Sequence, residues 1–231
     1  MLDQHDLASV LSHVLWIGGS PCAGKSSIGH TIERTHVFLG YHLDAMARNH
    51  LARRLAEGDP EMEAFLKMSM DQRWVQRPVE ALVQETIRSW SKEFLLTIED
   101  LLAMPKEWFI VAEGNFFPEC LAPYLSSPHQ AIWLVPTPAF CNQIRRRRAA
   151  EQAARRARHG VANKSSDPEK HLSNVIARDS QLAQHVKQQA EQRNLTVYEV
   201  DGTRSLDEMT TLVEQHFEPY LIERLSKMNP F

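Results

Sequence analysis

One short stretch of the chain has glycines, a lysine and a serine at the spacing that phosphate binding requires. In the segment VLWIGGSPCAGKSS, Gly19 is followed after four residues by Gly24-Lys25-Ser26, which fits the pattern G-x-x-x-x-G-K-[ST] without a mismatch. In such a loop, backbone N–H groups turn inward towards phosphate oxygens, and glycine permits the positive φ that this turn needs. The lysine neutralises phosphate charge, and the serine offers a ligand to magnesium. The segment therefore predicts a site for the phosphates of a nucleotide such as ATP, together with Mg2+.

The surroundings of this motif support the same prediction. An apolar run precedes it and a helix-forming run follows it, which is the strand–loop–helix context that the motif needs. A helix that begins at the loop points its positive end at the anion. We interpret Cys22 as a small residue that fills the loop, not as a catalytic thiol. The residues that we expect to contact the nucleotide here are Gly19, Ser20, Pro21, Cys22, Ala23, Gly24, Lys25, Ser26 and Ser27.

Two carboxylates follow apolar runs and could take part in phosphate chemistry. Asp44 comes 19 residues after Lys25 and directly after VFLGYHL. If the strand that ends there lies near the first strand, Asp44 faces the terminal phosphate, where it could accept the proton of a substrate hydroxyl or hold magnesium through water. Alternatively, Asp44 only caps the next helix. Glu113, after WFIVA, could hold a magnesium-bound water or orient an acceptor hydroxyl, or it could only bond local backbone or pair with an arginine.

The segment 145–158, RRRRAAEQAARRAR, is strongly basic. By itself it could be a nucleic-acid-binding helix or a solvated basic face. Its place after the fourth apolar run is similar to that of the lid helix of a P-loop kinase, a resemblance that implies arginines which close over phosphates and stabilise transferring charge. Residues three or four apart share a helix face, so we expect one or two arginines to touch the phosphates, and our candidates are Arg145 and Arg148. The same resemblance implies an arginine that returns to the phosphates from the helix after the lid, which makes Arg178 a further candidate, with a surface ion pair as the alternative.

The residues that would select the acceptor are less sharply defined. Arg73, Trp74 and Arg77 could hold an anionic or planar acceptor by ion pairing and stacking, although Trp74 could equally anchor this region on the core. The apolar stripe of the helix expected at 78–103, which includes Trp90, is interpreted as core. Near the end of the chain, a three-residue turn could border an adenine ring or be a plain turn. The acceptor-side candidates are Asp44, Arg48, Arg73, Trp74, Arg77 and Glu113, and the turn is Asp201-Gly202-Thr203.

Short apolar runs alternate with stretches of helical periodicity, which predicts an α/β fold with a parallel sheet. The chain is expected to form one domain, 1–231, with a helical acceptor-side excursion at about 45–107 and a lid excursion at about 138–194. The expected strands are 13–18, 36–40, 108–112, 131–135 and 196–200. The expected helices are 25–34, 44–57, 78–103, 138–158, 168–193 and 205–227.

Composition narrows the class of protein. Hydrophobic residues make up 43% of the 231 and charged residues 24%, as in globular proteins, and the net charge of −3 gives no general attraction to nucleic acid or anionic membranes. The apolar runs are far shorter than the roughly 20 residues of a membrane span, and the N-terminus is unlike a signal peptide. The three cysteines form no C-x-x-C pair, and a cysteine in the phosphate loop favours a reducing compartment. We therefore expect a cytoplasmic protein without a membrane partner.

Taken together, these motifs resemble the nucleoside-monophosphate-kinase-like P-loop kinases. The resemblance rests on GGSPCAGKSS, Asp44, a helical insertion, a strand ending in Glu113-Gly114 and an arginine-rich helix. Within that group, the spacing is most similar to chloramphenicol phosphotransferase and similar small-molecule kinases. The resemblance implies a five-stranded parallel sheet flanked by helices, ATP as the phosphate donor, an acceptor pocket in the first excursion and a lid in the second.

These observations predict an ATP- and magnesium-dependent phosphotransferase that moves the γ-phosphate to a hydroxyl of a small molecule. Lys25, Asp44, Arg145, Arg148 and Arg178 would be catalytic, and Ser26 and Glu113 would serve the metal. One alternative is a kinase of nucleotides or polynucleotide ends, which would bind nucleic acid in a salt-dependent way. Another is an ATPase or regulatory switch that hydrolyses ATP without an acceptor.

Overall fold

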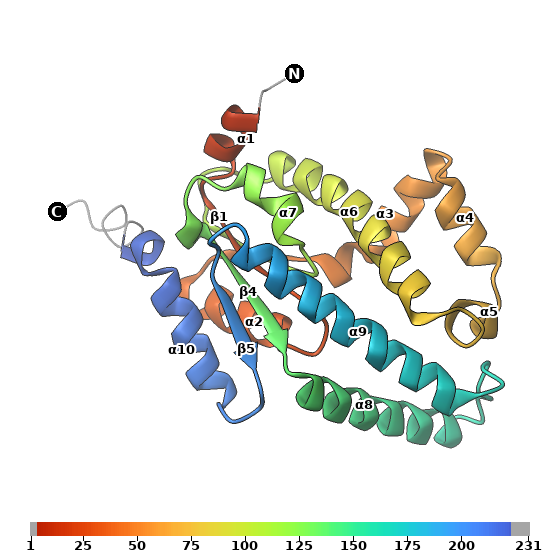
Figure 1. The fold of residues 1–231 in the computed structure, drawn as a ribbon. Helices are drawn as coiled ribbons and strands as arrows, with labels where there is room; N and C mark the ends of the chain where they lie inside the picture. Colours follow the sequence, from red (N-terminus) through yellow and green to blue (C-terminus); the bar gives the residue numbers. More distant parts are fainter. Residues whose placement is uncertain (1–3, 223–231) are drawn as a thin grey trace.

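The computed structural model describes residues 4–222 and contains a five-stranded sheet (Figure 1). All paired strands are parallel, and their order across the sheet is β2-β3-β1-β4-β5. This confirms the predicted α/β fold with a parallel sheet. The strands are β1 Val14–Gly19, β2 Leu39–His42, β3 Ile110–Glu113, β4 Ala131–Pro136 and β5 Val197–Val200.

Helices follow each strand and fill the two long excursions. Five of the six expected helices are observed with both ends within two residues of the prediction, and among them the one expected at 25–34 ends two residues later. The helix expected at 205–227 is observed as α10, followed by helical residues 218–222, and its expected end at 223–227 lies outside the described residues. The α-helices are α1 Gln4–Val10, α2 Lys25–His36, α3 Leu43–Ala56, α4 Pro60–Lys67, α5 Met70–Trp74, α6 Val79–Ala103, α7 Pro118–Leu121, α8 Pro138–Arg158, α9 Pro168–Glu191 and α10 Leu206–His216.

The sheet separates two apolar cores because successive strand residues point to opposite faces. On β1, Val14 and Trp16 belong to the core beneath α6 and α9, whereas Leu15 and Ile17 belong to the core beneath α2 and α10. All four side chains are completely buried. The result is a three-layer arrangement, with helices on both faces of a continuous apolar sheet (Figure 1).

Two details of the second strand differ from the sequence prediction. β2 begins at Leu39, not at residue 36, because α2 continues to His36 and Val37 then adopts a left-handed conformation with φ of 55°. More importantly, β3 lies between β2 and β1, so the strand before Asp44 is not the neighbour of the strand before the phosphate loop. Asp44 must therefore reach the loop across the end of β3.

The two helical excursions touch each other away from the sheet. Asp71 of α5 accepts hydrogen bonds from the Ser165 hydroxyl at 3.0 Å and the Ser166 backbone N–H at 2.9 Å, both in the loop that joins α8 to α9. The indole of Trp74 stacks on His171, with ring centroids 5.9 Å apart. Within residues 4–222, no helix is long and apolar enough to cross a bilayer.

Candidate functional site

The loop after β1 has the backbone conformation of a phosphate cradle. Positive φ values occur at Gly19 (132°), Cys22 (72°) and Gly24 (80°), so the chain reverses direction between β1 and α2. A side chain at Gly19 would collide with the carbonyl oxygen of Leu134 on β4, which explains why this position needs glycine. The loop leads directly into α2, whose first residue is Lys25. A helix N-terminus therefore adjoins the loop directly, which is an arrangement that favours binding of an anion.

Lys25 is held in place beneath this loop. Its side chain is buried, and Nζ donates hydrogen bonds to the Ser20 carbonyl oxygen at 2.8 Å and to Asn115 Oδ1 at 3.1 Å. Burial lowers the pKa of Lys25 to about 8, although the negative charges of Glu113 and Asp44 act in the opposite direction. A phosphate would add further negative charge beside this ammonium and favour its protonated form.

The two residues proposed for magnesium lie in direct contact. The Ser26 hydroxyl donates to Glu113 Oε2 at 3.0 Å, and Glu113 is only 3% exposed at the end of β3. His42 Nδ1 lies 3.1 Å from the other oxygen of Glu113, so the carboxylate is fixed from both sides. A hydroxyl and a carboxylate are the hard oxygen ligands that magnesium prefers, and here they meet where the end of β3 lies against the start of α2. This donor set fits the metal.

Asp44 also faces this region, although it does so from α3. It is the second residue of that helix and is exposed, and its charge is felt at Lys25. The cap position of α3 belongs to His42, so the alternative of Asp44 as the capping residue is wrong. Asp44 extends across the end of β3 because α3 begins immediately at the carboxyl end of β2.

All three candidate arginines line the same cavity as the loop after β1. Arg145 and Arg148 come from α8, and Arg178 comes from α9. Asp179, which is completely buried, accepts a hydrogen bond from Arg145 Nε at 2.6 Å and another from Arg178 Nη2 at 2.7 Å. Arg178 thus forms a buried ion pair with Asp179, and not a surface ion pair. Arg148 is exposed.

These groups enclose a cavity of about 340 Å3, which we call the polar pocket. Its walls combine the phosphate loop, the end of β3, Asp44 and the three arginines. The residues that line it are Pro21, Cys22, Ala23, Gly24, Lys25, Ser26, Ser27, Asp44, Trp90, Glu113, Gly114, Asn115, Arg145, Arg148 and Arg178. The lining therefore combines four cationic side chains with two carboxylates, which are the kinds of group that a site for a phosphate chain, a metal and a hydroxyl would require.

A second cavity of about 180 Å3, the aromatic pocket, shares Trp90 and Arg178 with the polar pocket. Three rings line it, from Phe65 of α4, Trp74 of α5 and Trp90 of α6. The Arg178 guanidinium lies 5.1 Å from the centre of the Trp74 ring. Trp74 both anchors the first excursion on α9 and lines the aromatic pocket, so the two interpretations of this residue are compatible.

Other candidates on the acceptor side lie elsewhere. Arg48 is exposed on α3 and lines neither pocket. Arg73 donates to the Leu66 carbonyl oxygen at 2.8 Å, and Arg77 forms an ion pair with Glu85. These contacts hold α4, α5 and α6 together, so the structure does not bring the three arginines to either pocket.

The turn at Asp201-Gly202-Thr203 is held by hydrogen bonds between its own residues. Asp201 Oδ1 accepts hydrogen bonds from the Thr203 backbone N–H at 2.9 Å and from its hydroxyl at 2.7 Å. A side chain at Gly202 would meet the ring of Phe140, so this turn packs on the start of α8. It does not line the polar pocket.

Three residues of the site were missed in the sequence. Asn115 follows Glu113-Gly114 and binds Lys25, and its place just after a strand was an available signal. Asp179 directly follows the candidate Arg178, and an acid beside a basic candidate was also visible. Trp90 had been interpreted as core, and it does pack against the core while also lining both pockets. No sequence pattern distinguishes those two environments.

Comparisons with known proteins give little further information. No protein-family model matches the chain, and no curated protein matches it. A solved structure described as a "putative kinase" from Chloroflexus aurantiacus is 15% identical, with the match covering 88% of this chain and 97% of that one at a TM-score of 0.41. A likeness this loose carries no argument about function.

Proposed function

We propose that this chain is a kinase that transfers the γ-phosphate of ATP to a hydroxyl of a small molecule, with magnesium as its cofactor. The observation that carries the proposal is the pair of adjoining pockets. One is polar and has four cationic side chains in its lining, and the other is lined by aromatic rings. The polar pocket suits the donor phosphates. The aromatic pocket gives an acceptor a place beside them, which an ATPase without an acceptor would not need.

Each group in the polar pocket has a role that follows from its charge and position. Lys25 and the loop N–H groups would bind the donor phosphates, while Arg145, Arg148 and Arg178 would neutralise charge that develops during transfer. Asp44, the exposed carboxylate, would orient the acceptor hydroxyl and accept its proton. Ser26 and Glu113 would hold magnesium, which when bound draws negative charge away from the phosphates.

The apolar lining of the aromatic pocket favours an acceptor with a planar or apolar body. A volume near 180 Å3 is close to the roughly 150 Å3 cavity that accommodates a benzene ring, so the pocket suits a single ring with its substituents. The hydroxyl to be phosphorylated would extend past Trp90 towards Asp44. A polynucleotide end is too large for this enclosure, so we favour a small molecule.

Donor binding is tested first, by calorimetry with Mg·ATP. Lys25→Ala should weaken binding by at least tenfold, because it removes a charge that contacts the phosphates. Lys187→Ala is the matched control, since Lys187 pairs with Glu199 on the surface and lines neither pocket. Equal affinities for the two variants would contradict the assignment of the phosphate site.

Transfer is tested by following ATP consumption across a panel of hydroxylated metabolites, nucleosides and aromatic alcohols. We expect consumption that depends on one class of acceptor, requires magnesium and disappears in Lys25→Ala. A phosphorylated acceptor detected by mass spectrometry would identify the product. Magnesium-dependent hydrolysis at the same rate with every compound and with none would instead indicate an ATPase.

A further inference from the structure

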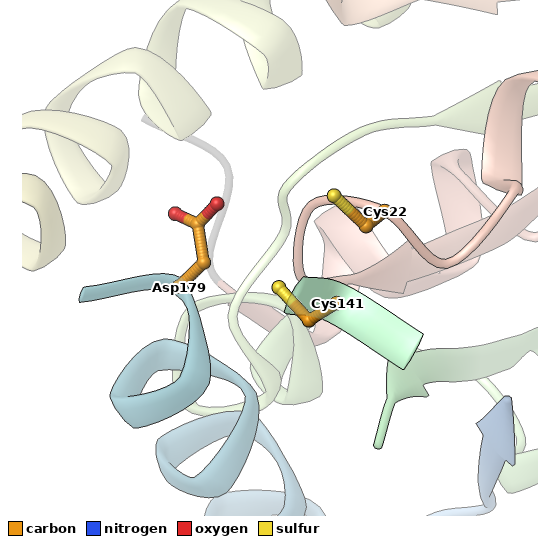
Figure 2. A group of neighbouring side chains, drawn as sticks. All are labelled: Cys22, Cys141 and Asp179. Atoms are coloured by element: carbon orange, nitrogen blue, oxygen red, sulfur yellow. The ribbon is translucent and has the colours of Figure 1, made fainter. Parts of the chain in front are cut away.

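Two of the three cysteines lie together beside the polar pocket, although they are distant in sequence. Cys22 belongs to the phosphate loop, and Cys141 lies near the start of α8 (Figure 2). Their sulfur atoms and a carboxylate oxygen of Asp179 all lie within 4.8 Å of one another. Cys22 is 7% exposed and lines the polar pocket, whereas Cys141 is completely buried. One sulfur thus faces the pocket and the other lies behind it.

A cluster of two thiols and a carboxylate could in principle hold a thiophilic metal, but the neighbours of Asp179 argue against it. One of its oxygens already accepts from Arg145 at 2.6 Å, and the other accepts from Arg178 at 3.0 and 2.7 Å. Two guanidinium groups would also repel an incoming cation. The pair of thiols is therefore better suited to covalent chemistry with each other.

The surroundings make Cys22 the more reactive thiol of the two. A hydrogen bond from Cys141 and the nearby charges of Arg145 and Arg148 lower the pKa of Cys22 to about 7, against the opposing effects of burial and of Asp179. The same hydrogen bond, together with burial, raises the pKa of Cys141. Cys22 is thus the more acidic thiol of the two, and Cys141 is the one that holds its proton more tightly. Reactive cysteines occupy such electropositive, partly accessible places.

We propose that Cys22 and Cys141 form a reversible disulfide when the protein meets hydrogen peroxide, and that this disulfide weakens nucleotide binding at the phosphate loop. The Cys22 thiolate attacks one peroxide oxygen, the O–O bond breaks, and the second oxygen leaves as hydroxide. The sulfur of Cys141 then attacks the Cys22 sulfenic acid. The S–S bond forms as the S–O bond breaks, and the oxygen departs as water with the Cys141 proton. Two electrons pass from the thiols to the peroxide.

The expected effect on nucleotide binding, which rests on the proposed function, comes from the geometry of the loop. A disulfide requires sulfurs about 2.05 Å apart, so the two sulfur atoms, which lie within 4.8 Å of each other, must come closer. Cys141 is buried on a helix, whereas Cys22 sits in a loop with φ of 72°, so in this proposal the closure draws the loop towards α8. Displaced N–H groups no longer fit the phosphates. Loss of the thiolate charge acts in the opposite direction, so the sign of the change in affinity is a stringent test.

The disulfide itself is tested by intact mass on the full chain. After peroxide treatment, unfolding in denaturant and alkylation under non-reducing conditions, we expect one alkylated thiol, Cys120, and a cross-link between the peptides of Cys22 and Cys141. Dithiothreitol should restore three alkylated thiols. Cys120→Ser is the matched control and should form the same cross-link. In Cys141→Ser the cross-link should be absent, and dimedone should label Cys22 as a sulfenic acid. Two or three alkylated thiols after peroxide, or a cross-link that involves Cys120, would overturn the proposal.

The effect on the site is tested by calorimetry with Mg·ATP on the same samples. Oxidised protein should bind at least tenfold more weakly than reduced protein, and dithiothreitol should restore the affinity. Unchanged or tighter binding by protein shown to carry the disulfide would overturn the proposed control of binding. If reduced protein binds no Mg·ATP, the proposed function and this control both fail, while the mass measurement still decides whether the disulfide forms.

Discussion

Asp179 offers the sharpest test of how the arginines are held. Its carboxylate is completely buried and is shared by Arg145 of α8 and Arg178 of α9. Asp179→Asn keeps the shape of the side chain but removes the charge that both guanidinium groups face. Their side chains are 23% and 10% exposed, so water replaces the lost counter-charge only in part. The free energy of unfolding should therefore fall.

The size of this effect follows from the burial of the pairs. Removing one partner of a buried ion pair costs about 3–5 kcal/mol. Both arginines border the open polar pocket, where solvent relieves some of the cost, so we expect the lower end, about 3 kcal/mol. For a chain of this length, each kcal/mol shifts the melting temperature by about 2–4 °C, which gives a fall of about 6–12 °C.

The fall in melting temperature is measured by thermal unfolding of Asp179→Asn and of a control variant. The matched control is Glu169→Gln, which breaks the pair between Arg146 and Glu169 on the same two helices, where both side chains are more than half exposed. An exposed pair contributes at most about 1 kcal/mol, so this variant should lose under about 4 °C. Mg·ATP should raise the melting temperature of Asp179→Asn more than that of the unaltered protein, because phosphates would replace the missing charge. A loss in Asp179→Asn no larger than in Glu169→Gln would refute the reasoning.

Three further predictions concern the base, the lid and the dependence of stability on pH. Asp44→Asn should leave Mg·ATP affinity nearly unchanged and reduce transfer by about two to four orders of magnitude, whereas full transfer would move the role of base to Glu113. Arg148→Ala should reduce turnover by about a hundredfold with little change in melting temperature; a basic helix that binds nucleic acid would instead show lost oligonucleotide affinity with a salt slope. Burial is the largest influence and would raise the pKa of Asp59, but the hydrogen bonds from Arg54 and from the Met62 backbone N–H, with the charge of Arg54, together outweigh it and lower the pKa to about 2. A lowered pKa stabilises the fold above the ordinary value of about 4, so urea unfolding between pH 5 and 2 should show a loss about 2 kcal/mol larger in the unaltered protein than in Asp59→Asn.

Much of the fold could be predicted from the sequence, because a strand that is buried on both faces of a parallel sheet has apolar residues at successive positions. Such a strand is recognisable in the sequence as a continuous apolar segment. β1, β3 and β4 each appear in the sequence as such a run, and each begins within two residues of the expected position. The phosphate loop was equally clear, because its function depends on backbone conformation and therefore on glycine at fixed spacing. Lys25 and Ser26 take their places from the helix that begins in the same motif.

The acceptor side could not be predicted in the same way, because its residues are positioned by contacts between distant segments. No local sequence pattern predicts the order of the strands, in which β3 lies beside β1. Arg77 was a reasonable candidate by charge, yet it lines neither pocket and instead pairs with Glu85, a residue of the next helix that borders the aromatic pocket. Asn115 reaches Lys25 across 90 positions of the chain. The local periodicity of the sequence predicts single helices and strands. Contacts between residues that are far apart in the sequence depend instead on how those helices and strands pack.

Arg178 shows why neither excursion explains the site by itself. The residue comes from α9 in the lid excursion, but its guanidinium lies over Trp74 of the acceptor-side excursion and also binds Asp179 beside the polar pocket. It lines both cavities, so its guanidinium is a contact that the two pockets share. If a molecule bound in one pocket shifts Arg178, the affinity of the other pocket changes, and the change is the same factor in both directions because coupling between two sites is reciprocal. A single shared cation therefore gives the two pockets a physical means of responding to each other.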